Sequence, residues 1–548
     1  MWRVQDADDP SSGRQKEPMS GLDRNRHRLR IVVPAFPAFN IYSSIAHMTT
    51  ALGPVCVASA VNEIEGWDAE VIDENNLGRY GPRADGGADH EVLQQQRPAD
   101  VVGFYGGLTS TIPRLYELAR RYKRYGVMTI AGGQHFVGEN VAEALSSGVD
   151  YVVFGEGECT IRELLEVVEG RRDPHDIKGI AYLENGQVVH TAAREPLQDF
   201  DHLPYPDFSL VRYAKIRIYP VERIRGCCMN CEFCTVKGKP RAAPIERLLG
   251  NISYLVETHN ARHFFIVDDL FGQQRDETVE FCRRLAEYQE RIGKRLVTTV
   301  QIRLDKARDP ELLAAMRQAG IRHVAIGFES PIDEELKAMN KAVRAEEMLS
   351  LVHVYRRFGF MVHGMFIFGY PPTENTRFTM SIPDRVRRFK TFIRKAKIDT
   401  VQVLLPVPLP GTELRRRLEK QHRVYPIEDV GWEYYDGNFP LFEPDEPLTG
   451  PELQQAGKRI MSRVYRFRCA LLVAAHTLSF PAIVLSLHDL RLGWRRWYRP
   501  WRNSVIRFGG WLTMRKWSAA FQRSDFLGRL QSARERLQLT HRGIRRAH

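Results

Sequence analysis

Short apolar runs alternate with segments of helical spacing from about residue 30 onward. The first runs lie at residues 31–34, 69–73, 100–104, 127–131 and 150–154, and helical patterns lie at 112–125 and 141–147. Buried strands that alternate with helices are typical of a parallel sheet whose strands are joined by crossover helices. The pattern therefore predicts an α/β chain that opens with a doubly wound parallel-sheet domain over residues 29–170.

Turn-rich sequence separates this domain from the next series of strands. Asn185-Gly186 predicts a hairpin, and Leu203-Pro204-Tyr205-Pro206 contains too many turn residues for a helix. We therefore expect a linker with a hairpin at residues 171–212.

A second series of apolar runs follows the linker. The runs lie at residues 219–224, 264–268, 297–301, 323–328, 362–368 and 400–405, with helix-length segments between most of them. Six strand–helix units predict a partial (βα)6 TIM barrel over residues 213–440. Its active site should lie at the carboxyl ends of the strands.

The two ends of the chain differ from these domains. Residues 1–28 are polar and lack the apolar core of a signal peptide, which predicts a disordered lead and a cytoplasmic protein. Residues 441–548 form a basic, helical extension. Within it, residues 469–487 carry no Asp, Glu, Lys or Arg, and the length of this uncharged run is near that of a membrane span. Polar residues within that run and arginines on both sides favour an interfacial anchor over a span.

Charge is concentrated in this extension. The chain has a formal net charge of +12, and residues 490–548 contain fifteen Arg or Lys against Asp525 and Glu535. Tryptophans interleave with the arginines, as expected at an anionic headgroup layer. A solvated helical cap on the barrel is the competing interpretation, and nucleic-acid binding is disfavoured because no recognised module accompanies the tail.

Four of the eight cysteines fall within positions 227–234, in a loop after the first predicted barrel strand. Such clustering indicates metal chemistry, and thiolates suit an iron–sulfur cluster. A zinc site would need a second Cys or His pair at matching spacing, and none follows. Cys227, Cys231 and Cys234 form one possible triplet of ligands, and Cys228, Cys231 and Cys234 form another.

The Cys-x3-Cys-x2-Cys spacing with Phe233 before the last cysteine resembles the signature of radical S-adenosylmethionine (SAM) enzymes. Further matches to that barrel lie at residues 265–271, 327–330, 366–371 and 408–412. The resemblance implies a [4Fe–4S] cluster on Cys227, Cys231 and Cys234 that leaves one iron open for SAM. Cys228 is then a packed neighbour.

Side chains at the predicted strand ends are candidates for SAM binding. Glu329 is the main candidate, because a carboxylate there can bind a ribose hydroxyl or an ammonium group. Gln301, Arg303, Phe233 and Asp269 are the others. For Asp268 and Asp269, an N-cap of the following helix is an equally good interpretation.

Glycine and polar residues follow several strands of the first domain, at the edge where open α/β sheets bind ligands. With the order of the two domains, they resemble the cobalamin (B12)-binding subfamily, which includes hopanoid methylases and the anaerobic Mg-protoporphyrin ester cyclase. The Asp-x-His-x-x-Gly motif, whose histidine binds cobalt in other cobalamin proteins, is missing. The alternative interpretation of the glycines after the strands is that they form tight turns. Candidate cobalamin contacts are Thr109, Ser110, Gly132, Gly133, Gly155, Glu156, Gly157 and Glu158.

The resemblance implies cleavage of SAM to a 5′-deoxyadenosyl radical and a cobalamin-dependent methyltransferase that acts on an unactivated carbon or phosphorus. The alternatives are a radical cyclase or rearrangement enzyme and a non-catalytic iron–sulfur redox or binding protein. The expected partners are a small-molecule or lipid substrate, an electron donor such as a flavodoxin or ferredoxin, and a membrane surface at the tail. This would make the protein cytoplasmic, and peripheral at the inner membrane face.

Overall fold

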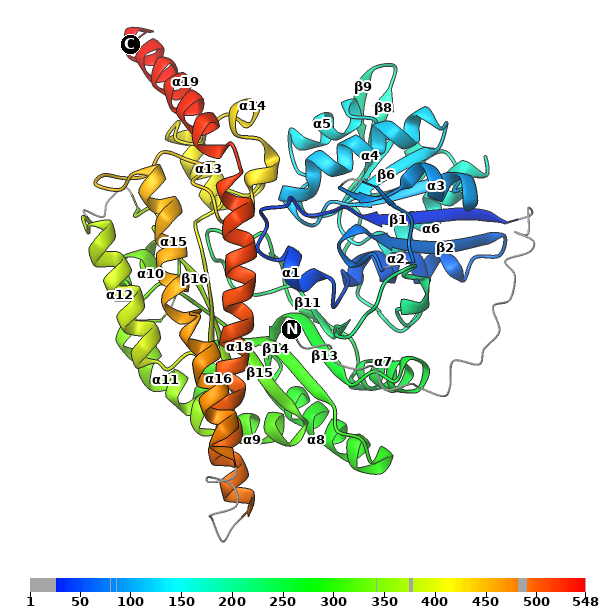
Figure 1. The fold of residues 1–548 in the computed structure, drawn as a ribbon. Coiled ribbons are helices and arrows are strands. Elements are labelled where there is room, and N and C mark those ends of the chain that lie inside the picture. Colours follow the sequence, from blue (N-terminus) through cyan, green and yellow to red (C-terminus); the bar gives the residue numbers. More distant parts are fainter. Residues whose placement is uncertain are drawn as a thin grey trace.

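The computed structural model describes residues 26–78, 80–84, 86–341, 343–373, 378–480 and 490–547. Residues 1–25 of the predicted disordered lead lie outside this range. The described chain forms two large, mainly parallel sheets and a set of C-terminal helices (Figure 1). The α/β fold class is therefore confirmed.

The first sheet has seven strands in the order β2-β1-β5-β6-β7-β8-β9. The five strands predicted from apolar runs form its parallel part, and the hairpin at Asn185-Gly186 extends it antiparallel from β7. The sheet thus continues into the segment expected to be a linker. Its strands are β1 (His27–Val33), β2 (Trp67–Asp73), β5 (Val101–Tyr105), β6 (Met128–Gly132), β7 (Tyr151–Val153), β8 (Ile180–Glu184) and β9 (Gln187–His190).

Helices cover both faces of this sheet. On one face α2 packs against α6, and on the other α4 and α5 pack against β5, β6 and β7. The first-domain helices are α1 (Ser43–Ala46), α2 (Leu52–Asn62), α3 (His90–Gln96), α4 (Ile112–Arg124), α5 (Asn140–Ser146) and α6 (Gly157–Val168). A two-stranded ribbon, β3 (Arg83–Ala84) and β4 (Gly87–Ala88), lies at its edge.

The second sheet has six parallel strands in sequence order. The first predicted strand is divided, because β10 ends at Val221 and a short β11 (Ile224–Arg225) pairs antiparallel with β12 (Arg241–Ala242). The six strands are β10 (Tyr219–Val221), β13 (His263–Phe271), β14 (Val297–Ile302), β15 (Ile321–Glu329), β16 (Met361–Ile367) and β17 (Thr400–Leu404).

Burial alternates strictly along the later barrel strands. In β16 and β17 every second residue is fully buried, and the residues between are half-buried. Successive side chains of a strand point to opposite faces, so one face is sealed by helices and the other is partly open. The helices between and after the strands are α7 (Ile245–His259), α8 (Arg275–Ile292), α9 (Pro310–Gln318), α10 (Asp333–Ala338), α11 (Ala345–Arg357), α12 (Ile382–Lys395), α13 (Glu413–Lys420) and α14 (Ile427–Val430).

The C-terminal extension folds onto the free edge of the barrel. Its helices are α15 (Gly450–Val464), α16 (Arg468–Leu478), α18 (Leu490–Gln522) and α19 (Phe526–Ala547), and α15 packs on β17 (Figure 1). The Tyr465 hydroxyl bonds both the N–H and the carbonyl of Val401, so it occupies backbone groups of the edge strand. Among the described helices, none is both long enough and apolar enough to cross a bilayer. Residues 481–489 of the uncharged run lie outside the described residues.

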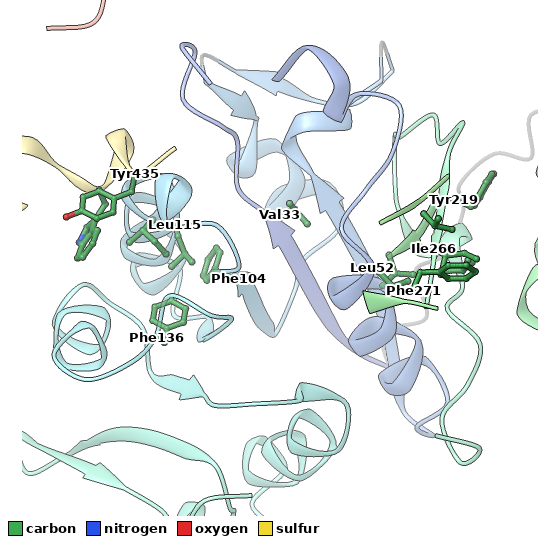
Figure 2. Close-up of a cluster of buried hydrophobic side chains, with 14 of the residues drawn as sticks. Val33, Leu52, Phe104, Leu115, Phe136, Tyr219, Ile266, Phe271 and Tyr435 are labelled. Carbon is green, nitrogen blue, oxygen red and sulfur yellow. The ribbon is translucent and has the colours of Figure 1, made fainter. Parts of the chain in front are cut away.

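One hydrophobic core joins the two sheets. It includes Phe104 and Phe136 of the first domain, Ile266 and Phe271 of β13, and Tyr435 after α14 (Figure 2). Because the buried surface is continuous, the two sheets pack as a single unit, which fixes the first domain above the barrel.

Candidate active site

The cysteine loop is held at both ends by the β11–β12 pair. Gly226, its first residue, has φ of +94°, and a Cβ there would lie 2.8 Å from the carbonyl oxygen of Lys239. Only glycine fits this turn without moving the backbone of the opposite strand. The two short strands therefore close residues 226–240 into a fixed loop.

Two carboxylates from the end of β13 bind the backbone where the loop begins. Asp269 Oδ2 accepts a hydrogen bond from Gly226 N at 2.7 Å, and Asp268 Oδ1 accepts from the N–H groups of Arg223 and Ile224. Burial raises the pKa of Asp268 to about 7. Neither aspartate caps the next helix, since α8 begins after Gln274. Both side chains instead position the loop.

The far side of the loop is tied to the end of the barrel by Glu232. Its carboxylate accepts from the Tyr370 hydroxyl at 2.7 Å and pairs with Arg417 of α13 at 2.6 Å. Its carbonyl accepts from Leu414 N at 3.1 Å. The loop is therefore braced by the segments after both β16 and β17.

Three of the four thiols share one electrostatic environment. Burial raises the pKa of Cys231, and although Lys341 opposes the shift, Glu329 and Cys227 add to it. Burial also raises the pKa of Cys234, and the charges of Cys231 and Cys227 raise it further. Cys228 is exposed, and its sulfur accepts a hydrogen bond from Gln273 Nε2 at 3.0 Å. The fourth thiol thus has a separate partner.

No three His, Cys, Asp or Glu side chains in the described chain converge closely enough to hold a single metal ion. A [4Fe–4S] cluster does not require that arrangement, because each thiolate binds a different iron.

Glu329 lies at the end of β15 and faces the cysteine loop. It has φ of +58°, and its carboxylate forms an ion pair with Lys341 at 2.9 Å. A Cβ on Gly327 would lie 2.4 Å from Glu329 Oε1, so the carboxylate folds back over that glycine. Lys341 also lies 5.8 Å from the ring centroid of Phe233. The sequence predicted Glu329 and Phe233 as candidates, whereas Lys341 has no motif around it and was not predicted.

Arg303 and Gln301 are placed differently from Glu329. The Arg303 guanidinium pairs with Asp305 and reaches the Met229 sulfur at 2.8 Å, so it contacts the cysteine loop. Gln301 lies exposed near the end of β14. Asp269, Arg303 and Glu329 therefore lie beside the loop at the carboxyl ends of β13, β14 and β15.

A cavity of about 300 Å³ opens at the carboxyl edge of the first sheet. Six glycines line it together with apolar side chains of β1, β5, β6, α2 and α6. The glycines are Gly53, Gly103, Gly132, Gly133, Gly155 and Gly157. Glu156, Glu158, Glu222 and Arg225 form its charged end. A Cβ on Gly133 would lie 2.4 Å from the Gly106 backbone, so the loops after β5 and β6 are in close contact.

Most of the predicted cobalamin contacts line this cavity, but two do not. Gly132, Gly133 and residues 155–158 are in its walls. Thr109 and Ser110 are buried in a 3-10 turn, η2 (Thr109–Thr111), that packs on η6 (Trp432–Tyr434) instead. Within the described residues no histidine lines the cavity, in agreement with the missing cobalt-ligand motif.

Arg225 joins the cavity to the cysteine loop. Its guanidinium pairs with Glu156 at 2.9 Å, Glu158 at 2.7 Å and Glu222 at 2.5 Å. Arg241 of β12 adds a second pair to Glu156 at 2.9 Å. Because Arg225 precedes Gly226 and Cys227, these ion pairs connect the start of α6 to the strand that leads into the loop.

Comparisons with known proteins agree with this division of the chain. Residues 41–165 match the B12 binding domain and residues 221–379 match the radical SAM superfamily. An uncharacterized methyltransferase of Pyrococcus horikoshii is 28% identical over 58% of this chain and 68% of its own length. The anaerobic magnesium-protoporphyrin IX monomethyl ester cyclase of Rubrivivax gelatinosus is 26% identical over 66% of this chain and 65% of its own length.

A solved structure shares the fold across both domains. The methyltransferase TsrM of Kitasatospora setae, with cobalamin and a [4Fe–4S] cluster bound, has a TM-score of 0.58 and 18% sequence identity. The match covers 72% of this chain and 78% of that one. The arrangement of the two domains is therefore found in a protein whose cofactors have been observed.

Proposed function

We propose that this chain, a radical SAM enzyme with a B12-binding domain, transfers a methyl group to an unactivated carbon or phosphorus of a small molecule or lipid. Its cofactors are a [4Fe–4S] cluster, SAM and cobalamin. The observation that carries the proposal is the position of the glycine-lined cavity, whose charged end is built from Arg225, two residues before Cys227. The cofactor cavity and the cysteine loop thus share one wall.

Cys227, Cys231 and Cys234 are the proposed cluster ligands. Their thiols influence one another electrostatically, and the loop that carries them is fixed by Asp269, Glu232 and the β11–β12 pair. Cys228 is the weaker choice for the first ligand, because its sulfur is exposed and hydrogen-bonded to Gln273. The three ligands leave one corner of a cluster without a protein ligand, where SAM binds in this family.

Glu329 is the proposed SAM contact outside the cluster. Its buried carboxylate can accept hydrogen bonds from a ribose or from an ammonium group, and Lys341 holds it over Gly327. Arg303 and Phe233 flank the same space. Asp269 acts through the loop backbone and is a positioning residue.

The glycine-lined cavity is the proposed cobalamin site. Its walls fit a largely apolar group, because six lining residues have no side chain and most of the others are apolar. When bound, the reduced cluster supplies the electron that opens SAM to a 5′-deoxyadenosyl radical, and cobalamin supplies the methyl group. The chain orients these groups, and its apolar walls exclude water from them.

A radical cyclase or rearrangement is the second candidate function, because the Rubrivivax gelatinosus relative is a cyclase.

The electron donor that we expect is a flavodoxin or ferredoxin, and we expect it to reach the cluster in the cytoplasm.

Peripheral membrane attachment through the C-terminal helices is a further part of the proposal. Helix α16 exposes Leu471 by 62% and Leu478 by 82%, and Phe467 just before it is exposed by 56%. Exposed apolar side chains beside arginines are typical of helices that lie in a membrane interface.

Analysis of the products tests the reaction class. Anaerobically reconstituted protein should convert SAM, in the presence of a reductant, into both 5′-deoxyadenosine and S-adenosylhomocysteine, separated by liquid chromatography. A methyltransferase needs both products, because one SAM yields the radical and another recharges the methyl donor. 5′-Deoxyadenosine without S-adenosylhomocysteine would favour the cyclase or rearrangement class.

A further inference from the structure

A second large cleft lies at the opposite end of the barrel from the cysteine loop. It has a volume of about 860 Å³ and lies between α12, α15 and α18, below the start of β17. Eight of its lining residues are basic, namely Arg356, Arg387, Lys390, Arg394, Lys397, Arg463, Arg466 and Arg507. Asp399 is its one acidic lining residue. We refer to this feature as the basic cleft.

Only part of this positive charge has a structural role. Asp399 is buried and pairs with Arg356 at 2.6 Å, Arg507 donates to the carbonyls of Ile398 and Asp399, and Arg387 pairs with Asp384. In the portion of the chain that the structure describes, the other five basic residues have no acidic partner. They are Lys390, Arg394, Lys397, Arg463 and Arg466.

These cations repel one another. Burial lowers the pKa of Lys390, and the charges of Arg463, Arg459 and Arg466 lower it further. A fold that gathers unpaired like charges in one cleft loses stability unless an anion neutralises them. Between residues 453 and 524 the chain has fourteen Lys or Arg and one acidic residue, Asp489. Apart from Asp489, which lies outside the described residues, this segment has no acidic side chain that could neutralise the cleft.

The exposed apolar side chains of α16 begin next to the cleft. Arg463 and Arg466 line it, and Phe467, Leu471 and Leu478 follow within the next three turns of the chain. Trp497 Nε1 of α18 donates to the carbonyl of His476 and so holds α16 against α18. The carboxyl end of α16 and the amino end of α18 project together at the lower end of the molecule in Figure 1, away from α13 and α14. Nucleic acid would contact the cations but would not cover exposed leucines.

We propose that the basic cleft binds the phosphate of anionic phospholipid headgroups when α16 lies in the membrane interface. This rests on the membrane attachment proposed above and names its ligand chemistry. The docked surface lies at the amino ends of the barrel strands. The carboxyl ends, with the cysteine loop, then face away from the bilayer toward water-soluble partners.

Vesicle sedimentation with the full chain tests this inference and needs no cofactor. Wild-type protein should bind phosphatidylcholine vesicles that contain phosphatidylglycerol, and binding should weaken as salt rises. Arg463→Gln with Arg466→Gln should weaken that binding roughly thirtyfold, because each basic residue near an anionic surface contributes about fivefold. Arg463→Lys with Arg466→Lys should restore it.

Arg124→Gln with Lys178→Gln is the matched control, because it removes two exposed charges from the first domain and should leave binding unchanged. Leu471→Glu with Leu478→Glu tests the apolar attachment separately from the headgroup site. This variant should bind more weakly both to vesicles that contain phosphatidylglycerol and to vesicles of phosphatidylcholine alone. Equal binding of the wild type and the Arg463/Arg466 glutamine variant to anionic vesicles would overturn the headgroup site.

Lipid headgroups and free inorganic phosphate carry the same anionic group. Competition with inorganic phosphate shows which of the two the basic cleft binds. Inorganic phosphate added at the same concentration as the lipid phosphate of the vesicles should not displace the protein from anionic vesicles. Displacement by free phosphate, or a preference for a DNA oligonucleotide over vesicles, would overturn the proposal.

Discussion

At the scale of single residues, the cysteine loop depends on contacts that any larger side chain would destroy. Gly226 has left-handed φ and lies against the Lys239 carbonyl, and Asp269 binds its N–H at 2.7 Å. Gly327 makes room for the Glu329 carboxylate in the same way. These contacts fix the backbone where the cysteine loop begins and the position of the Glu329 carboxylate, the candidate SAM contact.

Single alanine substitutions should divide the four cysteines into ligands and a neighbour. Cys227→Ala, Cys231→Ala or Cys234→Ala should each remove most of the iron bound after anaerobic reconstitution, because a cluster with two protein ligands is not held. Cys228→Ala should keep wild-type iron and the visible absorption of the cluster. If instead Cys228→Ala loses iron and Cys227→Ala keeps it, the alternative triplet is correct.

His135 should make the stability of the protein depend on pH. Its ring is buried and its Nε2 atom has no hydrogen-bond partner within the described structure. Burial, with the charge of Arg415, lowers its pKa from 6.5 to about 3. The unfolded chain therefore takes up a proton below about pH 6.5 that the folded chain does not, so stability is lost as pH falls through this window.

Denaturant unfolding of the wild type and of His135→Phe measures this effect. Between about pH 7.5 and about pH 5.5, the wild type should lose about 1.4 kcal/mol more than the variant. The comparison removes the contribution of the other titrating groups, which both proteins share. The same pH dependence in both proteins would mean that His135 takes up a proton as readily in the folded protein as in the unfolded chain.

At the scale of elements, short pieces of structure join the two domains. The β11–β12 pair carries Arg225 and Arg241. Both pair with Glu156, just before α6, and Arg225 also pairs with Glu158 in the first turn of that helix. Glu156 and Glu158 were expected to contact cobalamin through their loop. Both residues line the cavity, and their carboxylates pair with these arginines.

Arg225→Gln should destabilise the protein by about 3 kcal/mol, because it leaves three largely buried carboxylates without their shared cation. Arg241→Gln should have a smaller effect, since Glu156 is its one carboxylate partner within the described structure. Chemical unfolding of the two variants measures the difference. Equal losses would mean that Arg225 is not the main connection between the domains.

The C-terminal helices are part of the folded core as well as a surface. Phe521 of α18 lies 5.1 Å from the ring of Phe439 and 4.8 Å from that of Trp517, and all three are buried. Phe521→Ala should cost about 3–5 kcal/mol of unfolding free energy. Leu512→Ala, at a position that is 50% exposed, should change it by less than about 0.5 kcal/mol. Similar effects for the two would show that α18 does not pack on the barrel.

At the scale of the whole molecule, much of the architecture could be predicted because buried parallel strands are continuous apolar runs. The five parallel strands of the first sheet and all six of the barrel were predicted close to their observed positions. The cysteine spacing located the loop. The two-residue strands β11 and β12 could not be predicted, because neither is long enough to show a period.

Other features depend on contacts between distant residues. Lys341 and Arg225 lie among ordinary charged positions in the sequence, and only folding brings them to Glu329 and Glu156. Thr109 and Ser110 followed the expected strand, but their turn packs on η6 and leaves the cavity to the glycines. The apolar runs predicted where the strands end, but they could not predict where each following loop packs in the folded chain.

Both domains together define the central claim, that the cysteine loop and the glycine-lined cavity hold two cofactors side by side. The most direct measurement is the iron and cobalamin content of one anaerobic sample, reconstituted with iron, sulfide and hydroxocobalamin and then freed of unbound cofactor. We expect about four irons and about one cobalamin per chain. Iron without cobalamin would contradict the assignment of the cavity, and the absence of bound iron would contradict the assignment of the cysteine loop.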